Sequence, residues 1–282
     1  MQTLSVIKKD MEFNRGLSSL IEVLKNIAVS QYRSLERKIK SFEILQTAIE
    51  SFFELIDPSH IDHPFLNAVD KPQAVVAITS DSGLLGGLNM QVVSTAMLEL
   101  EKHPGQLIVI GERGKMYAGE YKTPFVAFPG IKEEDRYAQA MQVRDYLISK
   151  ILDGSLGPLQ VVYPHPVSFT LQRVEKSHFL PFVSPFEKKA QGEGAKRDII
   201  FESGFDVCIE YLVYLWMGQK LYEIFGLSRL AEYAARYVHL EESLQKLREM
   251  DGKLRLQYFR VRHELIDRNM RELFSARLLY TH

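Results

Sequence analysis

The N-terminal end of the chain carries apolar residues at the spacing of a coiled coil. From Leu17 onward they recur alternately four and three positions apart, as in the seam between paired helices. The seam runs through Leu17, Ile21, Leu24, Ala28, Gln31, Leu35, Lys38, Phe42, Leu45, Ile49, Phe52 and Ile56. Only Gln31 and Lys38 are polar, so the pattern predicts one continuous helix over residues 1–57.

The C-terminal end repeats the same spacing. Its seam runs through Leu230, Tyr233, Tyr237, Leu240, Leu244, Leu247, Asp251, Leu254, Tyr258, Val261 and Leu265. Asp251 is the one polar member, and Gly252 beside it marks a weak point. We expect a second helix over residues 198–282, with a bend or break among Gly204, Gly218 and Gly226, because glycine weakens a helix interior.

Proline placement separates these ends from the middle of the chain. The first of the eleven prolines is Pro58 and the last is Pro185, so both ends lack the strongest helix breaker. Unbroken helices of these lengths would run about 80 Å and over about 100 Å. Helices this long must bury their apolar stripes on each other, and a chain that returns from a central insert makes antiparallel pairing natural.

The middle of the chain reads as an α/β domain over residues 58–185. Short β-branched runs alternate there with amphipathic stretches, which is typical of a parallel-type sheet. We expect strands at 74–79, 107–110 and 123–128, helices at 89–102 and 134–152, and further strands at 159–162 and 169–174. The last two suggest a hairpin that turns at Pro164, His165 and Pro166. Residues 186–197 are polar and glycine-containing, and we interpret them as a mobile loop.

Composition excludes several classes of protein. With 46% hydrophobic and 25% charged residues the chain is not disordered throughout, and a net charge of -1 gives no general attraction to nucleic acid or anionic membranes. Cys208 is the single cysteine, which excludes an intramolecular disulfide and indicates a reducing compartment. The sequence shows neither an apolar run long enough to span a bilayer nor the apolar core of a signal peptide.

A glycine-rich stretch, SDSGLLGGLN at residues 80–89, follows a predicted strand and opens a predicted helix. Backbone amides at such a turn can cradle a phosphate. The stretch lacks both the GxGxxG pattern and the lysine of a phosphate loop, and the apolar Leu84 and Leu85 indicate a turn packed against the sheet. A tight structural turn is therefore favoured over a ligand site.

Other candidate chemistry is weak. Residues 111–115 (GERGK) have the wrong spacing for a phosphate loop and are better explained as a strand-to-helix connection. His60, Asp62 and His63 could offer metal ligands, but no second pair matches them, and a solvated turn is favoured. Ser82 has no evident His and acid partners. The sequence thus predicts no catalytic, cofactor or metal site.

Positive charges gather on the two predicted helices despite the near-neutral total. They are Lys8, Lys9, Lys25, Arg33, Arg37, Lys38 and Lys40 in the first helix, and Arg255, Arg260, Arg262, Arg268, Arg271 and Arg277 in the second. Antiparallel pairing would collect them at one end of the helix pair. A solvated helix face is the ordinary explanation, and docking to an acidic partner is the alternative.

Taken together, these features resemble the gamma subunit of F-type rotary ATP synthases. That family carries S-D-R-G-L-C-G-G-L-N where residues 80–89 differ only at Ser82 and Leu85. A family segment like SEHAARMxAM corresponds to SRLAEYAARYVHL from Ser228, in which Glu232, Ala234, Ala235 and Arg236 are recognisable. The N-terminal region like MxMVAAxKxRR corresponds to residues 24–33, without its methionine pair.

The resemblance extends along the last helix, where the family has a pattern like LxYNxxRQxxITxELxEI. The matching residues are Leu256, Tyr258, Arg262, Ile266, Glu272 and Leu273. The departures are Phe259 for Asn, His263 for Gln, Asp267 for Thr and Asn269 for the first Glu. The chain is therefore similar to a divergent member of this family, over essentially its whole length.

The resemblance implies a rotor without catalytic residues of its own. In the family, two long helices form an antiparallel coiled coil around a Rossmann-like α/β domain and turn inside a ring of alpha and beta subunits. The domain lies on the epsilon subunit and the membrane c-ring, and rotation couples ion flow to ATP synthesis or hydrolysis. Residues at the implied ring-contact positions are Arg262, His263 and Asp267, with Lys25 and Arg33 as neighbours. The implied location is peripheral, at the cytoplasmic face of the cell inner membrane.

Two further interpretations stay open at this point. A signalling or scaffold protein could bind a small ligand in the α/β domain and relay that event through the coiled coil. A nucleotide-dependent enzyme would need a phosphate site that the sequence does not show. Copurification with a ring ATPase would discriminate among them.

Overall fold

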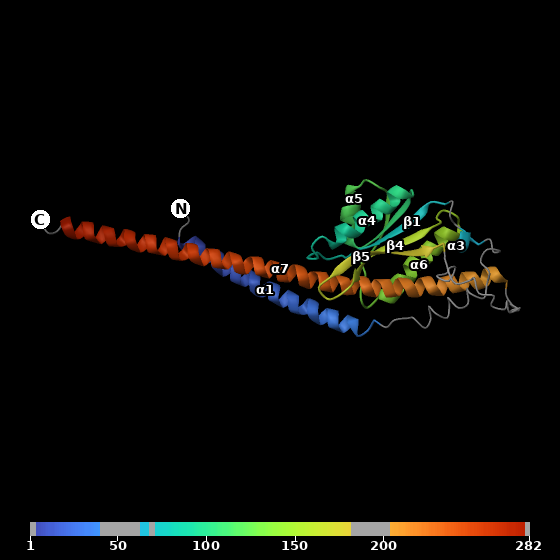
Figure 1. Ribbon diagram of the computed structural model, residues 1–282, viewed down its shortest axis with the longest axis horizontal. Coiled ribbons are helices and arrows are strands. Elements are labelled where there is room, and N and C mark those ends of the chain that lie inside the picture. Colours follow the sequence, from blue (N-terminus) through green and yellow to red (C-terminus); the bar gives the residue numbers. More distant parts are fainter. Residues whose placement is uncertain (1–3, 40–62, 68–70, 182–203, 280–282) are drawn as a thin grey trace, which may run out of the picture. The chain divides into compact units, whose positions relative to one another are not determined.

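The computed structural model describes residues 4–39, 63–67, 71–181 and 204–279 (Figure 1). The chain divides into two compact units. One comprises Met1–Ser30 with Arg236–His282, and the other comprises Gln31–Ala235. Two helices, α1 (Leu4–Glu36) and α7 (Phe205–Leu279), contribute residues to both units.

The second unit is built on a five-stranded sheet in the order β3-β2-β1-β4-β5. The strands are β1 (Gln73–Ile78), β2 (Gly105–Ile110), β3 (Phe125–Phe128), β4 (Leu159–Pro166) and β5 (Gln172–Leu180). The first four are parallel, and β5 pairs antiparallel with β4. The helices between them are α3 (Pro64–Asn67), α4 (Leu88–Lys102), α5 (Glu112–Glu120) and α6 (Arg136–Leu152). The predicted α/β architecture is confirmed.

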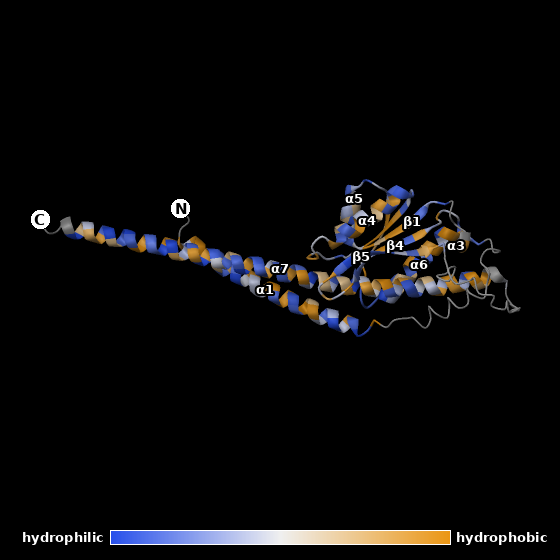
Figure 2. Ribbon diagram, viewed as in Figure 1, coloured by the Kyte–Doolittle hydropathy of each residue, from blue (hydrophilic) through white to orange (hydrophobic). Residues whose placement is uncertain are grey.

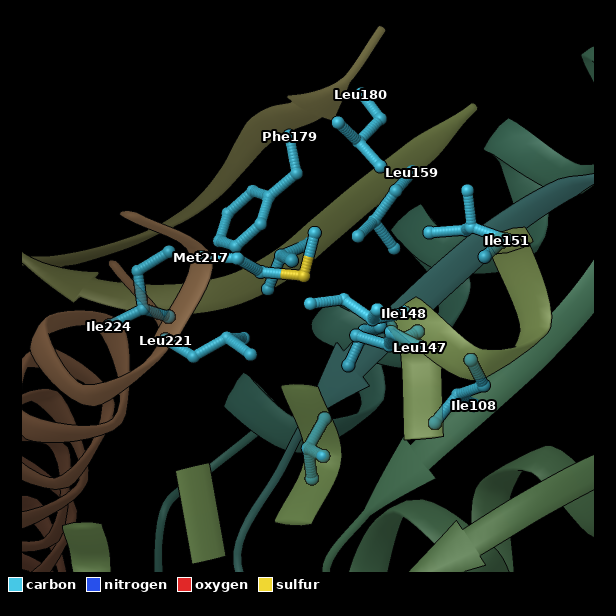
Figure 3. Close-up of a cluster of buried hydrophobic side chains, with 14 of the residues drawn as sticks. Ile108, Leu147, Ile148, Ile151, Leu159, Phe179, Leu180, Met217, Leu221 and Ile224 are labelled. Carbon is cyan, nitrogen blue, oxygen red and sulfur yellow. The ribbon is translucent and has the colours of Figure 1, made fainter. Parts of the chain in front are cut away.

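The central strands β1, β2 and β4 are largely buried on both faces, as expected for parallel strands. Side chains alternate along β1, so that Val75 and Ala77 pack against α4, while Val76 and Ile78 belong to the cluster formed with α6 and α7. Figure 3 shows this second cluster, in which Met217 and Leu221 of α7 meet strand residues such as Leu159. The central strands are correspondingly apolar in Figure 2, whereas the edge strand β5 is largely hydrophilic. Within this unit, α7 is part of the domain core.

A glycine fixes the connection from β2 to α5. Gly111 has a φ of 101°, and a Cβ there would lie 2.6 Å from the carbonyl oxygen of Thr79. Only glycine tolerates both the left-handed backbone and this close approach. The helix α5 begins at the next residue, Glu112, so the predicted strand-to-helix connection is confirmed but consists of Gly111 alone, and residues 112–115 belong to the helix.

The predicted hairpin turn at residues 164–166 is wrong. The strand β4 continues through these residues to Pro166, which pairs with Gln172 of β5. The pairing of β4 with β1 ends at Val162. Beyond that residue β4 pairs on one side only among the described residues. Prolines are tolerated in such edge positions because no partner needs their missing N–H.

In the first unit, α1 and α7 pair antiparallel along the predicted seam. Asn14 Nδ2 donates a hydrogen bond to the Leu247 carbonyl (3.0 Å), and Lys25 forms an ion pair with Glu241 (2.7 Å). The apolar seam includes Ile21, Leu240, Leu244, Leu17, Leu24 and Leu247. The predicted orientation and the heptad spacing of this part of the chain are confirmed.

The helix α1 differs in extent from the prediction, whereas the predicted ends of the second helix, at residues 198 and 282, lie outside the described residues. The helix α1 ends at Glu36 and is followed by a turn at Arg37 and Lys38, so a single helix to residue 57 is wrong. The predicted seam from Phe42 to Ile56 lies outside the described residues, as do the predicted domain boundaries and the loop at 186–197. The helix α7 begins directly after Gly204 and passes Gly218, Gly226 and Gly252 unbroken.

Candidate functional site

Side chains of α7 fill the place where an open α/β sheet ordinarily binds its ligand. Such ligands lie at the carboxyl ends of the strands where the strand order reverses, which here is between β1 and β4. Ser228, Arg229 and Glu232 enter this position and face the ends of β1 and β4. The cavity that remains measures about 10 Å³, which is room for a single water.

Side chains of the glycine-rich loop form hydrogen bonds within the loop itself. The Ser80 amide donates to Asn89 Oδ1 (3.1 Å), and Asn89 Nδ2 donates to Ser80 Oγ (2.8 Å). Leu85 is buried with Leu88 and Ala235, whereas Leu84 is exposed at a φ of 65°. These contacts support the structural-turn interpretation, although only Leu85 of the two leucines packs inward.

A buried carboxylate joins this loop to α7. Ser82 Oγ donates to Glu232 Oε1 (3.0 Å), and Arg229 forms an ion pair with Glu232 Oε2. Arg229 Nη2 also donates to the Tyr233 hydroxyl (2.8 Å). Burial disfavours the guanidinium charge, but Glu232 and Tyr233 more than offset this, so the pKa of Arg229 is raised above its ordinary value. The chain thus places its own anion on the glycine-rich loop.

Two of the residues predicted to contact a partner lie on α1. Lys25 forms the ion pair with Glu241, and its Nζ lies 6.0 Å from the centroid of the Tyr237 ring, so it contributes to the pairing of α1 with α7. Arg33 is exposed, and its carbonyl accepts a hydrogen bond from Arg37 Nε (3.1 Å). Of the two, Arg33 is the more available to a partner.

The other three predicted contact residues lie together on α7. Arg262, His263 and Asp267 are exposed, and so is every other side chain from Arg262 to Arg277. Glu241, the partner of Lys25, precedes Arg262 by about 30 Å of helix. The structure therefore does not bring Lys25 to the other three residues.

The predicted gathering of the basic residues at one end is wrong. Lys38 pairs with Glu133 of the α/β unit (2.7 Å). Antiparallel pairing brings the N-terminal part of α1, and not residues 33–38, to the C-terminal half of α7. The cationic side chains are therefore distributed along both helices.

Of the three possible metal ligands His60, Asp62 and His63, the structure describes only His63. His63 is buried, its Nδ1 accepts a hydrogen bond from the Phe65 amide (3.2 Å), and its Nε2 lies 3.6 Å from Glu210 of α7. The predicted solvated turn is wrong for His63, while His60 and Asp62 lie outside the described residues. Within the described part of the chain, no three His, Cys, Asp or Glu side chains form a potential metal site.

The sequence pointed to Glu232 within a motif but assigned it no contact, and it gave no role to Arg229. The available signal was an acidic residue three positions after an arginine in a mostly apolar helical segment, because a buried charge must find a partner.

The structure contains no membrane-spanning helix among its described residues, because none of the described helices is both long and apolar enough to cross a membrane.

Comparison with known proteins gives one consistent result. A family model described as ATP synthase matches residues 3–277. The ATP synthase gamma chain of Symbiobacterium thermophilum is 28% identical over 272 residues, which cover 93% of each chain. That of Clostridium acetobutylicum is 24% identical over 281 residues, covering 97% of this chain and 96% of the relative.

Solved structures show the same fold. A chain in the OSCP/F1/c-ring structure of the Euglena gracilis mitochondrial ATP synthase superposes with a TM-score of 0.73 at 16% identity, covering 98% of this chain and 93% of that one. A chain in the central stalk and c-ring of the Tetrahymena thermophila mitochondrial ATP synthase gives 0.59 at 18% identity, covering 79% and 99%.

Proposed function

This chain belongs to the ATP synthase family, and from that membership we propose that it is the gamma chain, the central-stalk rotor subunit of a rotary ATP synthase. The coiled coil of α1 and α7 turns inside a ring of alpha and beta subunits, and the α/β domain contacts the epsilon subunit and the c-ring. Rotation couples transmembrane ion flow to ATP synthesis or hydrolysis on the partner subunits.

One structural observation supports this function most directly. The helix α7 is continuous from Phe205 to Leu279. It is both a core element of the α/β unit and one of the two helices of the coiled coil. A single stiff helix shared by both units can pass torque between them. The chain itself is proposed to be non-catalytic, because the place for a ligand in its sheet is occupied by its own Arg229 and Glu232.

We place the exchange of torque with the ring on the exposed part of α7. Arg262, His263 and Asp267 project there without covering side chains, and Arg262 can make paired hydrogen bonds to a carboxylate of the ring. Arg33 is a secondary contact. Lys25 acts indirectly, because its ammonium group already binds Glu241 and stiffens the coiled coil.

As part of F1, the subunit lies peripherally at the cytoplasmic face of the cell inner membrane. Copurification tests the function as a whole: an affinity tag on this chain, expressed in its own host, should retrieve alpha, beta, epsilon and c subunits with ATPase activity. Recovery of the chain without ring subunits, together with tight binding of a small ligand, would instead support a signalling or scaffold protein.

A further inference from the structure

Two arginines of α6 stack on two tyrosines of α7 in the same manner. The guanidinium carbon of Arg136 lies 4.4 Å from the centroid of the Tyr222 ring, and that of Arg144 lies 3.4 Å from the centroid of the Tyr214 ring. Both arginines and both tyrosines are eight positions apart in sequence. The two antiparallel helices therefore carry the same contact twice, about 12 Å apart along the axis.

Each stacked arginine also lies against a glycine of α7. A Cβ at Gly218 would approach Arg144 Nη1 to 2.9 Å, and one at Gly226 would approach Arg136 Nη1 to 3.0 Å. Each glycine follows its tyrosine by four positions, which places ring and bare backbone on one helix face. The glycines that predicted a helix break thus form notches for the two guanidinium groups.

Both arginines are buried, but the two contacts differ in exposure and in hydrogen bonds, because Tyr214 is exposed whereas Tyr222 is half-buried. Arg136 and Arg144 are each 6% exposed. Arg144 donates to Asp145 Oδ1 from Nε (2.9 Å) and Nη2 (2.8 Å), and Nη2 also donates to the Tyr214 hydroxyl. Arg136 Nη2 donates to the Tyr222 hydroxyl (2.8 Å), while its Nε and Nη1 have no partner among the described residues. Between the two helices each arginine thus donates one hydrogen bond, and Arg144 is in addition oriented by Asp145 of its own helix.

From this geometry, and on the basis of the rotor function proposed above, we propose that Arg136 and Arg144 are positioning residues that form a torque-bearing joint between the α/β domain and α7. Apolar packing resists separation of α6 and α7 but is non-directional, so it resists sliding and rolling less. The interaction of a planar guanidinium group with a tyrosine ring and a glycine notch is directional, so it resists sliding and rolling of the two helices. Two such contacts fix both the position of α6 along α7 and its angle around it.

The test uses the complete complex in vesicles. ATP-driven membrane potential, recorded with a voltage-sensitive dye, is divided by the rate of ATP hydrolysis for wild type and variants. In Arg144→Ala this ratio should fall by about threefold or more. Arg144→Lys should lower the ratio as well, because an ammonium group cannot stack as a planar guanidinium does. Tyr214→Phe should retain most of the wild-type ratio, because the ring remains.

Two further variants separate the joint from general stability. Gly218→Ala favours the helix but pushes the guanidinium of Arg144 out of its notch, so the ratio should fall even where the melting temperature does not. Lys150→Ala removes a charge from α6 outside the joint and should behave as wild type. An unchanged ratio in Arg144→Ala would overturn the proposed joint. So would a proportional loss of membrane potential and hydrolysis rate in that variant, or a failure of both Arg144→Ala and Gly218→Ala to assemble into the complex. Absence of the wild-type chain from the complex would instead refute the rotor function.

Discussion

At the scale of single residues, Glu232 lies in an environment where removal of its charge strongly destabilises the fold. It is buried, and it accepts from Ser82 while pairing with Arg229. Glu232→Gln leaves the Arg229 charge without its counter-ion, and we expect the free energy of unfolding to fall by about 3 kcal/mol. Urea denaturation measures this. Glu272→Gln, at an exposed pair with Arg268, should change little, and an equally small change for Glu232→Gln would contradict the assigned contact.

Arg262 is the residue whose loss should reveal the contact with the ring. Truncating an arginine at a desolvated protein contact commonly costs about 2 kcal/mol. Arg262→Ala should therefore lower ATPase activity or assembly of the reconstituted complex, with a smaller effect for His263→Ala. Because Arg262 is exposed in the free chain, the helicity and the melting temperature of the isolated variant chain should equal those of the wild type. Full coupled turnover by the variant would remove Arg262 from the mechanism.

The sequence identified exposed residues of this kind more readily than buried pairs. Arg262, His263 and Asp267 are exposed on α7, as helical charges usually are, but exposure alone does not identify what they touch. The link between Ser82 and Glu232 joins residues 150 positions apart and has no local pattern. Lys25 illustrates the same limit, because its role depends on Glu241 in the other helix.

At the scale of elements, Glu99 makes the attachment of α4 to β5 sensitive to acid. A hydrogen bond from Lys102 lowers the pKa of Glu99 below its ordinary value, burial opposes this, and Lys176 of β5 lowers it further. A carboxyl group whose pKa is depressed by folding stabilises the fold above its ordinary pKa of 4.5, and this contribution is lost as pH falls through the folded value.

The consequence is a pH-dependent difference between wild type and Glu99→Gln. At neutral pH the variant should be less stable by about 1 kcal/mol, and the gap should close as the pH falls below 4.5. Denaturation curves across this range measure it. Glu101→Gln, on the exposed side of the same helix, should show no such gap. A gap for Glu99→Gln that persists at the lowest pH would exclude the charge as its cause.

Elements were predictable where one local cause determines them. The apolar run of β1 and the periodicity of α4 predicted both within a residue of their ends. The errors arose where a neighbour overrides local propensity. Prolines in β4 are tolerated because that strand loses one partner beyond Val162, and glycines in α7 are tolerated because they receive arginines of α6. The end of α1 at Glu36 left no break in the heptad spacing to mark it.

At the scale of the whole molecule, the filled sheet crevice predicts that the isolated chain does not bind ATP with micromolar affinity. The glycine-rich loop uses the Ser80 amide for Asn89, and Glu232 would repel a phosphate. Titration calorimetry of the purified chain with ATP should show no binding in that range, and a purified alpha–beta ring provides the positive control. Micromolar binding by this chain would require a different site or an opened crevice.

Sequence alone predicted the architecture of two paired helices around an α/β domain, because periodicity and proline placement are properties of the chain itself. It did not predict that α7 would also be part of the domain core. That depends on Met217, Leu221 and Ile224 meeting β4, β5 and α6, which the seam pattern does not contain. Long-range packing of this kind becomes visible only in three dimensions.

The antiparallel pairing of α1 with α7 also has a consequence for biosynthesis. Asn14 and the Leu247 carbonyl that it binds are separated by 233 positions. At a translation rate of about 5–20 residues per second, the ribosome needs about 12 to 47 s to supply the second partner after the first. Throughout that interval Ile7, Ile21 and Ala28, all buried in the finished protein, have no α7 to cover them. The helix α1 therefore leaves the ribosome well before its partner, and the nascent chain depends on chaperones to stay soluble until α7 follows.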